Sequence, residues 1–387
     1  MKKIAVIGGG ASGLAAALSA AQEAAFHEAD LDVVVFEAAD RIGKSILASG
    51  NGRCNFSNSS VVAEDYYHAD FVRKSFAALP AVDVLSFFQD AGLLWRTESE
   101  GRLYPLTNKA SSVLDVLRFA LQDREVGVEC RRKVLAVVPV KSQFMLSFED
   151  ERTAFFDAVI VACGGNIARS LLPTRYYYYN TEPLLGPLTT NTEPIRGLNN
   201  IRARCRLTCG DTSQEGEVQF RDYGISGIVT FDLSRFVRSG DKISIDFFPS
   251  FTKEEILGML KERFVRLQGR IAIEFCAGML QRPLALAVLR AAGIKAEEEM
   301  RETSISALAH AIKEFSLEVN GIEDYRQCQV RRGGFDVESF NPSTLESLTD
   351  PGLFLVGEAL DIDGPCGGYN LHWAWTSGIL AGRNAAL

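Results

Sequence analysis

The sequence predicts an α/β fold, and three stretches carry this prediction. Near the amino terminus, the β-branched run Lys3–Ile7 is typical of a buried parallel strand, and the alanine-rich stretch Ser12–Ala25 favours a helix. A second buried strand is expected at Leu31–Phe36, and alternating and helical patterns follow in the middle of the chain. Near the carboxyl terminus, a strand at 353–357 leads through a loop into a helix at about 371–386. Strands that alternate with helices indicate a parallel sheet covered by helices.

A glycine-rich turn joins the first expected strand to the first expected helix. Gly8, Gly10 and Gly13 have the GxGxxG spacing, which permits a tight turn, a close approach of the backbone to a pyrophosphate, and close helix–strand packing. Glu37 ends the next strand, where a carboxylate can accept hydrogen bonds from the ribose hydroxyls of an adenosine and repels a 2′-phosphate. This context favours a Rossmann-like dinucleotide site over a turn that binds no ligand.

The far end of the chain distinguishes FAD from NAD as the dinucleotide. Residues 353–371 run from an apolar strand through an acidic, glycine-rich turn into a helix. Glu358 or Asp361 can bind the ribitol or pyrophosphate side of a flavin, and Gly367 with Gly368 can bring the helix end against the isoalloxazine. An NAD enzyme needs no such half-site, so FAD is expected, although the turn could instead serve packing alone. The sequence has no second GxGxxG, so NADH or NADPH is expected only as a transient electron donor.

Composition disfavours several other classes of function. The formal net charge of −8 provides no basic footprint for nucleic acid. The cysteines form no CxxC pair and the histidines are isolated, so we expect no metal site. No run of roughly 18 apolar residues indicates a membrane span, and the amino terminus lacks the apolar length of a signal peptide. We therefore expect a cytoplasmic protein with a small-molecule substrate, and neither nucleic acid nor membrane as a partner.

Several longer motifs are similar to those of one bacterial flavoprotein family, which includes aminoacetone oxidase and the BaiN-type flavoprotein of bile-acid metabolism. The SGNGRCN and GGYNL motifs are far more specific than the glycine turn. The matching stretches are VIGGGASG (6–13), GKSILASGNGRCNFSN (43–58), GRLYPLTNKASSVLDVL (101–117), AVIVACGG (158–165), GISG (224–227) and GLFLVGEALDIDGPCGGYNLHWAWTSGILAG (352–382). They are spread over nearly the whole chain, which is identified as a member of this FAD-binding family by resemblance.

The resemblance implies a FAD-binding domain of the glutathione-reductase type, built from both chain ends, 1–185 and 336–387. Residues 186–335 would form an insertion with two parts. A β-barrel would take about 190–250 and 316–335, and a small helical domain would take about 251–315.

The resemblance also implies FAD contacts residue by residue. The glycine turn would hold the pyrophosphate, Glu37 the ribose, and the backbone of Val134 the adenine. The loop after residue 43 would lie beside the flavin, and the carboxyl-terminal segment would surround its ring. The implied contacts are Gly8, Gly10, Ala11, Ser12, Gly13, Glu37, Lys44, Ser49, Gly50, Arg53, Asn55, Val134, Cys163, Gly164, Gly357, Glu358, Asp361, Gly368, Tyr369, Asn370 and Leu371.

One stretch departs from the family pattern. After the ACGG strand, the family carries a Ser/Gly/Thr-rich stretch with a proline and a GDG-like turn, whereas this chain has GGNIARSLLPTRYYYYNTEPLLGPLTT. The run Tyr176–Tyr179 could wall a substrate pocket through stacking or phenol hydrogen bonds, or could lie on an exposed surface. Both alternatives stay open, and the resemblance does not assign the substrate.

Together, these observations predict a FAD-dependent oxidoreductase. The expected reaction is hydride transfer between flavin N5 and a small organic substrate, in an NAD(P)H-linked reduction. Two alternatives remain: an aminoacetone-like amine oxidase that passes electrons to oxygen, and a flavin-binding sensor without turnover. Flavin-assisted RNA modification is a remoter option, which the acidic balance of charge disfavours. The sequence assigns no catalytic acid or base.

Overall fold

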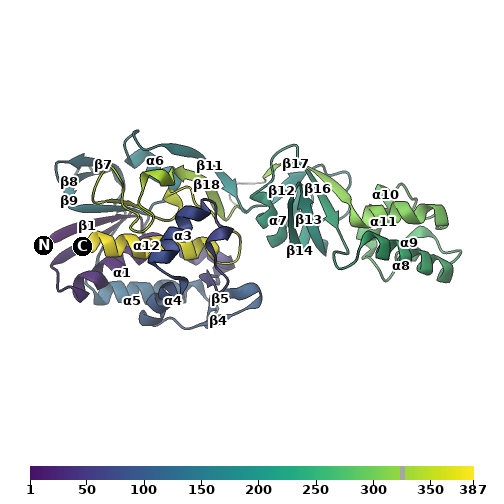
Figure 1. Cartoon of the computed structure of the whole chain (residues 1–387), viewed down its shortest axis with the longest axis horizontal. Coiled ribbons are helices and arrows are strands. Elements are labelled where there is room, and N and C mark those ends of the chain that lie inside the picture. Colours follow the sequence, from purple (N-terminus) through teal and green to yellow (C-terminus); the bar gives the residue numbers. More distant parts are fainter. Residues whose placement is uncertain (323–326) are drawn as a thin grey trace. The chain divides into compact units, whose positions relative to one another are not determined.

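The structure is a computed structural model that describes residues 1–322 and 327–387 (Figure 1). These residues form two compact units. The first unit comprises Met1–Glu182 and Val330–Leu387, so both ends of the chain contribute to it. The second unit is a continuous insertion, Pro183–Gln329.

A five-stranded parallel sheet forms the centre of the first unit, in the order β19-β10-β1-β2-β6. In β1, β10 and β19, successive residues are buried without alternation, which means that both faces of the sheet are covered. Continuous apolar, β-branched runs suit this environment. The strands are β1 (Lys2–Ile7), β2 (Leu31–Glu37), β6 (Gly127–Cys130), β10 (Ala158–Val161) and β19 (Leu353–Leu355).

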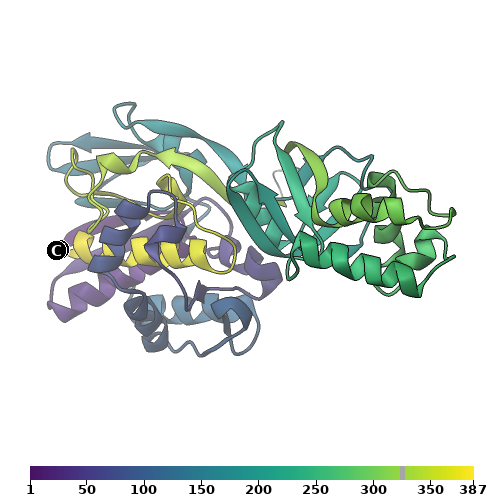
Figure 2. The same cartoon turned by 45° about the vertical axis from the view of Figure 1, so that its right-hand side comes forward.

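Two helices from opposite ends of the chain, α1 (Ala11–Phe26) and α12 (Tyr369–Ala386), pack side by side on this sheet (Figures 1 and 2). Glycines on α12 permit the close approach. A β-carbon at Gly378 would lie 2.3 Å, and one at Gly382 2.2 Å, from backbone oxygens of α1. Any larger residue at these positions would push the two helices apart.

Three small antiparallel sheets, β7-β8-β9, β3-β5-β4 and β11-β18, complete the first unit together with five further helices. The sheet β7-β8-β9 is anchored to the parallel sheet by aromatic contacts, because the rings of Phe148 and Phe156 lie 5.0 and 5.7 Å from that of Phe36. The elements are α2 (Lys44–Ala48), β3 (Ser57–Asn58), α3 (Ala69–Ala78), α4 (Ala81–Asp90), β4 (Trp95–Thr97), β5 (Arg102–Pro105), α5 (Ala110–Asp123), β7 (Val134–Val140), β8 (Gln143–Phe148), β9 (Thr153–Phe156), α6 (Gly165–Leu171), β11 (Tyr178–Leu184) and β18 (Val330–Phe335).

The second unit contains a closed six-stranded barrel, β12-β15-β14-β13-β16-β17, and a group of helices. Burial alternates along β13, as expected for a strand of a closed barrel. The inward-facing side chains of Cys205 and Leu207 are buried, and the outward-facing ones are not. A capping box between Thr252 and Glu255 starts the first long helix. The elements are β12 (Leu188–Thr190), β13 (Arg202–Cys209), β14 (Thr212–Arg221), β15 (Gly224–Ser226), α7 (Ile228–Ser234), β16 (Lys242–Asp246), α8 (Lys253–Arg266), α9 (Ala272–Phe275), α10 (Arg282–Ala291), α11 (Ile305–Lys313) and β17 (Phe315–Ile322).

The predicted fold class, a Rossmann-like domain with an inserted barrel and a helical part, is confirmed. One strand lies elsewhere than expected. Residues 330–335, which were expected in the barrel, form β18 and pair with β11 in the first unit. The rings of Tyr178 and Phe335 pack 5.2 Å apart, and this apolar contact holds β18 against β11.

We expect the contact between α1 and α12 to be sensitive to a single methyl group. Gly382→Ala places a β-carbon against the backbone of α1 and should lower the free energy of unfolding by about 1–3 kcal/mol. The matched control is Gly258→Ala on the exposed face of α8, where a β-carbon meets nothing within 4 Å and should stabilise the helix by about 0.5–1 kcal/mol. Urea unfolding followed by far-UV circular dichroism measures both, and equal effects would contradict the close packing.

Candidate flavin site

The glycine turn between β1 and α1 forms an open cradle of backbone N–H groups. Gly8 has φ of +109°, and a β-carbon there would lie 2.7 Å from a backbone oxygen of the neighbouring strand end. A β-carbon at Gly13 would lie 1.9 Å from the carbonyl oxygen of Gly8, so only glycine fits both positions. Gly10 precedes α1 and has no side chain with which to cap it. The first-turn N–H groups of Ala11 and Ser12 are therefore available to a phosphate, which the helix dipole also favours.

Glu37 lies at the rim of this cradle. Its two carboxylate oxygens accept hydrogen bonds from the N–H groups of Gly9, at 2.8 Å, and Ala39, at 2.7 Å, which hold the carboxylate in place at the end of β2. The N–H of Arg132 donates to the carbonyl oxygen of Glu37 at 2.9 Å, and β7 begins two residues later at Val134. The structure thus brings the predicted ribose and adenine contacts close to the same strand end.

The two cations predicted beside the flavin have partners within the protein. Lys44 pairs with Asp40 at 2.5 Å, and this ion pair lowers the pKa of the Asp40 carboxyl. Arg53 pairs with Glu98 at 2.6 Å, and its guanidinium carbon lies 4.1 Å from the centre of the Tyr104 ring. Lys44 is half exposed and can exchange its partner for a phosphate, whereas Arg53 is fixed between a carboxylate and a ring and so anchors the loop.

The rest of this loop approaches the amino end of α12. The Ser49 hydroxyl donates to the carbonyl oxygen of Ile46 at 2.6 Å, and Gly50 follows with φ of +56°. Asn55 Oδ1 is buried and has no hydrogen-bond partner among the residues that the structure describes. It would lie 3.0 Å from a β-carbon at Gly368. A buried amide oxygen without a partner suits a polar ligand at this place, because leaving such an atom unsatisfied is costly.

Cys163 and Gly164 follow β10, the strand beside β1, and flank the glycine turn. The Cα of Cys163 would lie 2.9 Å from a β-carbon at Gly8, which shows how closely the two strand ends approach. Burial raises the pKa of the Cys163 thiol to about 12, so it stays protonated and serves as a wall rather than as a nucleophile. Gly164 has φ of +76° and leads directly into α6.

The end of β19 meets the beginning of α1. The N–H of Gly357 donates to the hydroxyl of Ser377 at 2.9 Å, and a β-carbon at Gly357 would lie 2.8 Å from the hydroxyl oxygen of Ser12. The neighbouring Glu358 side chain touches solvent, but protein closely surrounds it, and this desolvation raises the pKa of its carboxyl to about 7. Asp361 is buried instead and accepts a hydrogen bond from the N–H of Gly333 at 2.7 Å.

The amino end of α12 presents a second set of helix N–H groups. Gly368, with φ of +102°, precedes the helix and cannot cap it with a side chain. The N–H groups of Tyr369, Asn370 and Leu371 therefore begin the helix at its positive end. The Asn370 amide is turned back onto the glycine-rich turn, where it bonds both the N–H and the carbonyl of Gly364 at 2.8 Å. These hydrogen bonds fix the conformation of the turn. They occupy the Asn370 side chain, so the backbone N–H groups of the first turn of α12 are the groups that can contact a ligand.

The predicted residues fit a FAD molecule. One helix end, at α1, suits the pyrophosphate, and the contact between Gly357 and Ser12 brings the carboxyl-terminal half-site next to it. The second helix end, at α12, suits the part of a reduced flavin that carries negative charge. Glycines line both ends at positions where a β-carbon would collide with the backbone.

Sequence reasoning missed two supporting side chains, Ser57 and Ser377, whereas a packing or hydrogen-bonding role is the ordinary expectation for His372. The buried His372 shares a hydrogen bond of 2.9 Å with Ser57, which ties α12 to the SGNGRCN loop, and burial lowers its pKa to about 4, so it is neutral. Ser377 accepts the Gly357 N–H, as described above. His372 and Ser57 both lie in segments that match the family motifs, and this match was the signal that could have found them. Their hydrogen bond could not be foreseen from the sequence, because the two residues are 315 positions apart.

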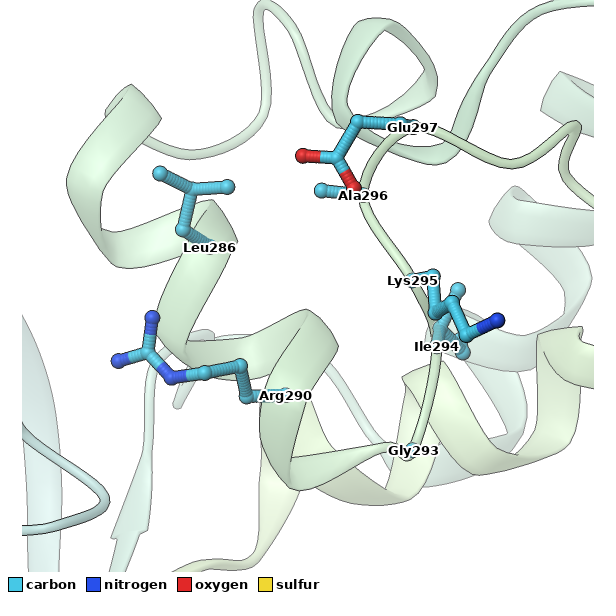
Figure 3. Close-up of a pocket in the computed structure, with 7 residues that line it drawn as sticks. All are labelled: Leu286, Arg290, Gly293, Ile294, Lys295, Ala296 and Glu297. Atoms are coloured by element: carbon cyan, nitrogen blue, oxygen red, sulfur yellow. The ribbon is translucent and has the colours of Figure 1, made fainter.

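A surface cavity of about 440 Å³ lies in the helical part of the second unit (Figure 3). Its lining is Leu286, Arg290, Gly293, Ile294, Lys295, Ala296 and Glu297, none of them a predicted site residue. Across the described part of the chain, no group of three or more His, Cys, Asp or Glu side chains is placed to hold a metal ion. Among the same residues, no helix combines the length and apolar character needed to cross a membrane.

We expect Glu37 to contribute to FAD affinity. Glu37→Gln replaces one carboxylate oxygen by an NH₂ group that faces N–H donors, so the dissociation constant for FAD should rise about tenfold or more. Glu149→Gln, at an exposed carboxylate, is the control. Both are measured by quenching of FAD fluorescence during reconstitution, and unchanged affinity in Glu37→Gln would refute the ribose assignment.

Gly368→Ala should lower the flavin content of the purified protein. Its β-carbon would lie 2.3 Å from the Ser57 carbonyl oxygen, so the helix end must move away from the loop. Gly92→Ala separates this collision from backbone strain, because Gly92 also has a positive φ, +90°, but a β-carbon there meets nothing within 4 Å. The ratio of visible to ultraviolet absorbance reports flavin content, and equal ratios for the two variants would count against the site.

Comparisons with known proteins agree with this geometry. The family model for the HI0933-like protein Rossmann domain matches residues 2–384. A 3-dehydro-bile acid delta(4,6)-reductase from Clostridium scindens is 32% identical, over 100% of this chain and 99% of its own. A ribosomal RNA dihydrouridine synthase from Escherichia coli is 25% identical, over 96% of this chain and 95% of its own. A solved 3-ketosteroid-delta4-(5alpha)-dehydrogenase from Rhodococcus jostii shares the fold, with a TM-score of 0.50, 14% identity, and coverage of 100% of this chain and 97% of that one.

The family match spans almost the entire chain, and the Clostridium scindens relative matches it from end to end. Both the amino-terminal and the carboxyl-terminal half-sites lie within the matched residues. The chain therefore belongs to the HI0933-like Rossmann-domain family and is a FAD-dependent oxidoreductase of that family.

Proposed function

We propose that this protein uses FAD to reduce a carbon–carbon double bond conjugated to a carbonyl group in a small organic molecule, with NADH or NADPH as the electron donor. The observation that carries the proposal is the convergence of two helix ends, α1 and α12, on one dinucleotide site. The relative that is 32% identical is named as a delta(4,6)-reductase, which supports reduction as the direction of the reaction.

FAD, when bound, would accept a hydride from the donor and pass it to the substrate, so one NAD(P)H and one proton are consumed per double bond. The protein holds the cofactor and stabilises charge. The N–H groups of Tyr369, Asn370 and Leu371 favour negative charge at the pyrimidine side of the ring, and α1 neutralises the pyrophosphate.

Glu358 is a group on the cofactor side of this unit that can exchange a proton near neutral pH. The side chain reaches solvent, but the protein packed around the carboxyl raises its pKa to about 7, and the nearby Arg331 opposes this shift. At neutral pH, the Glu358 carboxyl is therefore protonated for about half of the time. A carboxyl of this kind can hold a proton without adding full negative charge beside the cofactor.

A small molecule suits the charge of this protein better than RNA does, although one relative is a ribosomal RNA dihydrouridine synthase. The net charge is −8. Two of the three arginines of β13 are paired, Arg202 with Glu217 at 3.0 Å and Arg206 with Glu215. The third, Arg204, is exposed, and a single cation does not make a basic stripe. A nucleic-acid surface requires unpaired cations along the phosphate backbone.

Anaerobic stopped-flow mixing with NADH and with NADPH tests the proposal. Rapid bleaching of the visible absorbance of the oxidised flavin, followed by its return when an α,β-unsaturated ketone is added, is the expected result. Reduction by an amine with reoxidation in air, but no reaction with either nucleotide, would show an amine oxidase instead. Reduction by dithionite alone would indicate a flavin-binding sensor without turnover.

A further inference from the structure

The tyrosine run divides between the interior and the surface. Tyr176 is buried, where its hydroxyl contacts that of Ser347 at 2.6 Å. Tyr177 and Tyr179 are 62% and 41% exposed, and their rings meet edge to face with centres 4.9 Å apart. Tyr178 packs against Phe335 from the other side of the strand. This alternation is that of an extended strand, so two phenol rings project together from one face at the start of β11.

A third exposed tyrosine, Tyr67, lies against the segment 361–368, which leads into α12 at the ring end of the candidate flavin site. Tyr67, 42% exposed, donates its backbone N–H to the carbonyl oxygen of Asp363 at 2.8 Å, between Asp361 and the glycine-rich turn. Strand β18, which pairs with β11, links Tyr67 to the tyrosine pair. The Arg332 guanidinium on β18 lies 4.7 Å from the centre of the Tyr67 ring, and the residue after β18, Asp336, donates its N–H to the carbonyl oxygen of Tyr177 at 3.1 Å. The three tyrosines therefore lie on the same part of the first unit as the ring end of the flavin site.

The charged groups around these tyrosines already have partners. Arg332 lies over the Tyr67 ring at 4.7 Å and pairs with Asp363 at 2.8 Å. Asp361 accepts the N–H of Gly333, and Asp336 accepts the N–H of Glu338 at 3.3 Å. The surface thus offers an incoming molecule ring faces and phenol hydroxyls, while the carboxylates repel an anion.

The phenol of Tyr179 stays protonated at neutral pH. Asp336 is the main cause of its raised pKa, and the N–H of Asp336 donates to the carbonyl oxygen of Tyr177 at 3.1 Å, which places the acid beside the tyrosine pair. A protonated phenol donates a hydrogen bond, and a carbonyl oxygen accepts one.

We propose that Tyr67, Tyr177 and Tyr179 form the substrate-binding surface of the flavin-bearing unit, selective for an uncharged molecule with a flat ring system and a carbonyl oxygen. The inference rests on the proposed function, because it places the substrate beside segment 361–368 of the candidate flavin site. It assigns a role to the stretch in which this chain departs from the family pattern. Ring faces provide the affinity, and the phenol hydroxyls orient the carbonyl.

The test uses the flavin-loaded protein and the neutral steroid enone 4-androstene-3,17-dione as the probe. Perturbation of the visible flavin spectrum gives the dissociation constant. The double variant Tyr177→Ala/Tyr179→Ala should bind the probe at least about tenfold more weakly, because two ring contacts are lost. Tyr179→Phe, which keeps the ring and removes the hydroxyl, should weaken binding by about three- to tenfold. Phe119→Ala, an equally exposed aromatic position on α5, is the matched control and should change nothing.

Further probes define the chemical class. The open-chain enone 3-penten-2-one keeps the carbonyl but has no ring to pack, so the double variant should weaken its binding only by the about three- to tenfold expected from loss of the hydroxyl contact. Cinnamate and benzylammonium carry opposite charges, and tighter binding of either than of the steroid enone would overturn the assignment to an uncharged ligand. Equal affinity of the steroid enone for the double variant and the unaltered protein would overturn the surface itself.

Bleaching by NADH or NADPH without any substrate is recorded on the same preparations. If neither nucleotide bleaches the flavin, the proposed electron donor is contradicted. If bleaching occurs but the double variant binds the probe as tightly as the unaltered protein does, only the tyrosine surface is contradicted. The two failures are therefore distinguishable.

Discussion

The site depends on the close packing of α1 against α12. Each helix contributes one end to the candidate dinucleotide site, the two ends suiting different parts of FAD. Gly378 and Gly382 let the backbone of α12 approach that of α1, although the two helices lie at opposite ends of the sequence. Because the glycines leave no room for a side chain, the relative position of the two helix ends is set by backbone contact and is rigid.

This rigidity has an electrostatic consequence. Two helix ends with free N–H groups are directed at one dinucleotide, so the site is positive where the cofactor is negative although the whole chain carries a charge of −8. The acids near the site lie in different surroundings. Glu37 and Asp361 accept hydrogen bonds from backbone N–H groups, whereas the pKa of Glu358 is raised to about 7. A site of this kind can bind an anionic cofactor without a cluster of free lysines or arginines.

The tyrosine run shows how one short segment can serve both stability and recognition. Tyr176 stacks on Phe340, with ring centres 5.7 Å apart, and so belongs to the core of the first unit. Tyr177 and Tyr179 face outward because the chain there is extended and successive side chains alternate. The sequence left open a pocket wall or an exposed surface for this run; the structure exposes Tyr177 and Tyr179, and it buries Tyr176 in the core, which neither alternative included.

The sequence by itself determined the features whose physics is local. The strand–turn–helix unit at Gly8–Gly13 follows from backbone conformations that only glycine allows, and the position of Glu37 follows from the length of one helix and one strand. The second half-site was visible as a motif near Gly368. Only the tertiary structure decided which predicted contacts are engaged elsewhere, such as Arg53 with Glu98, and which strand β18 joins. These outcomes depend on contacts between residues far apart in the chain, whose packing no local pattern encodes.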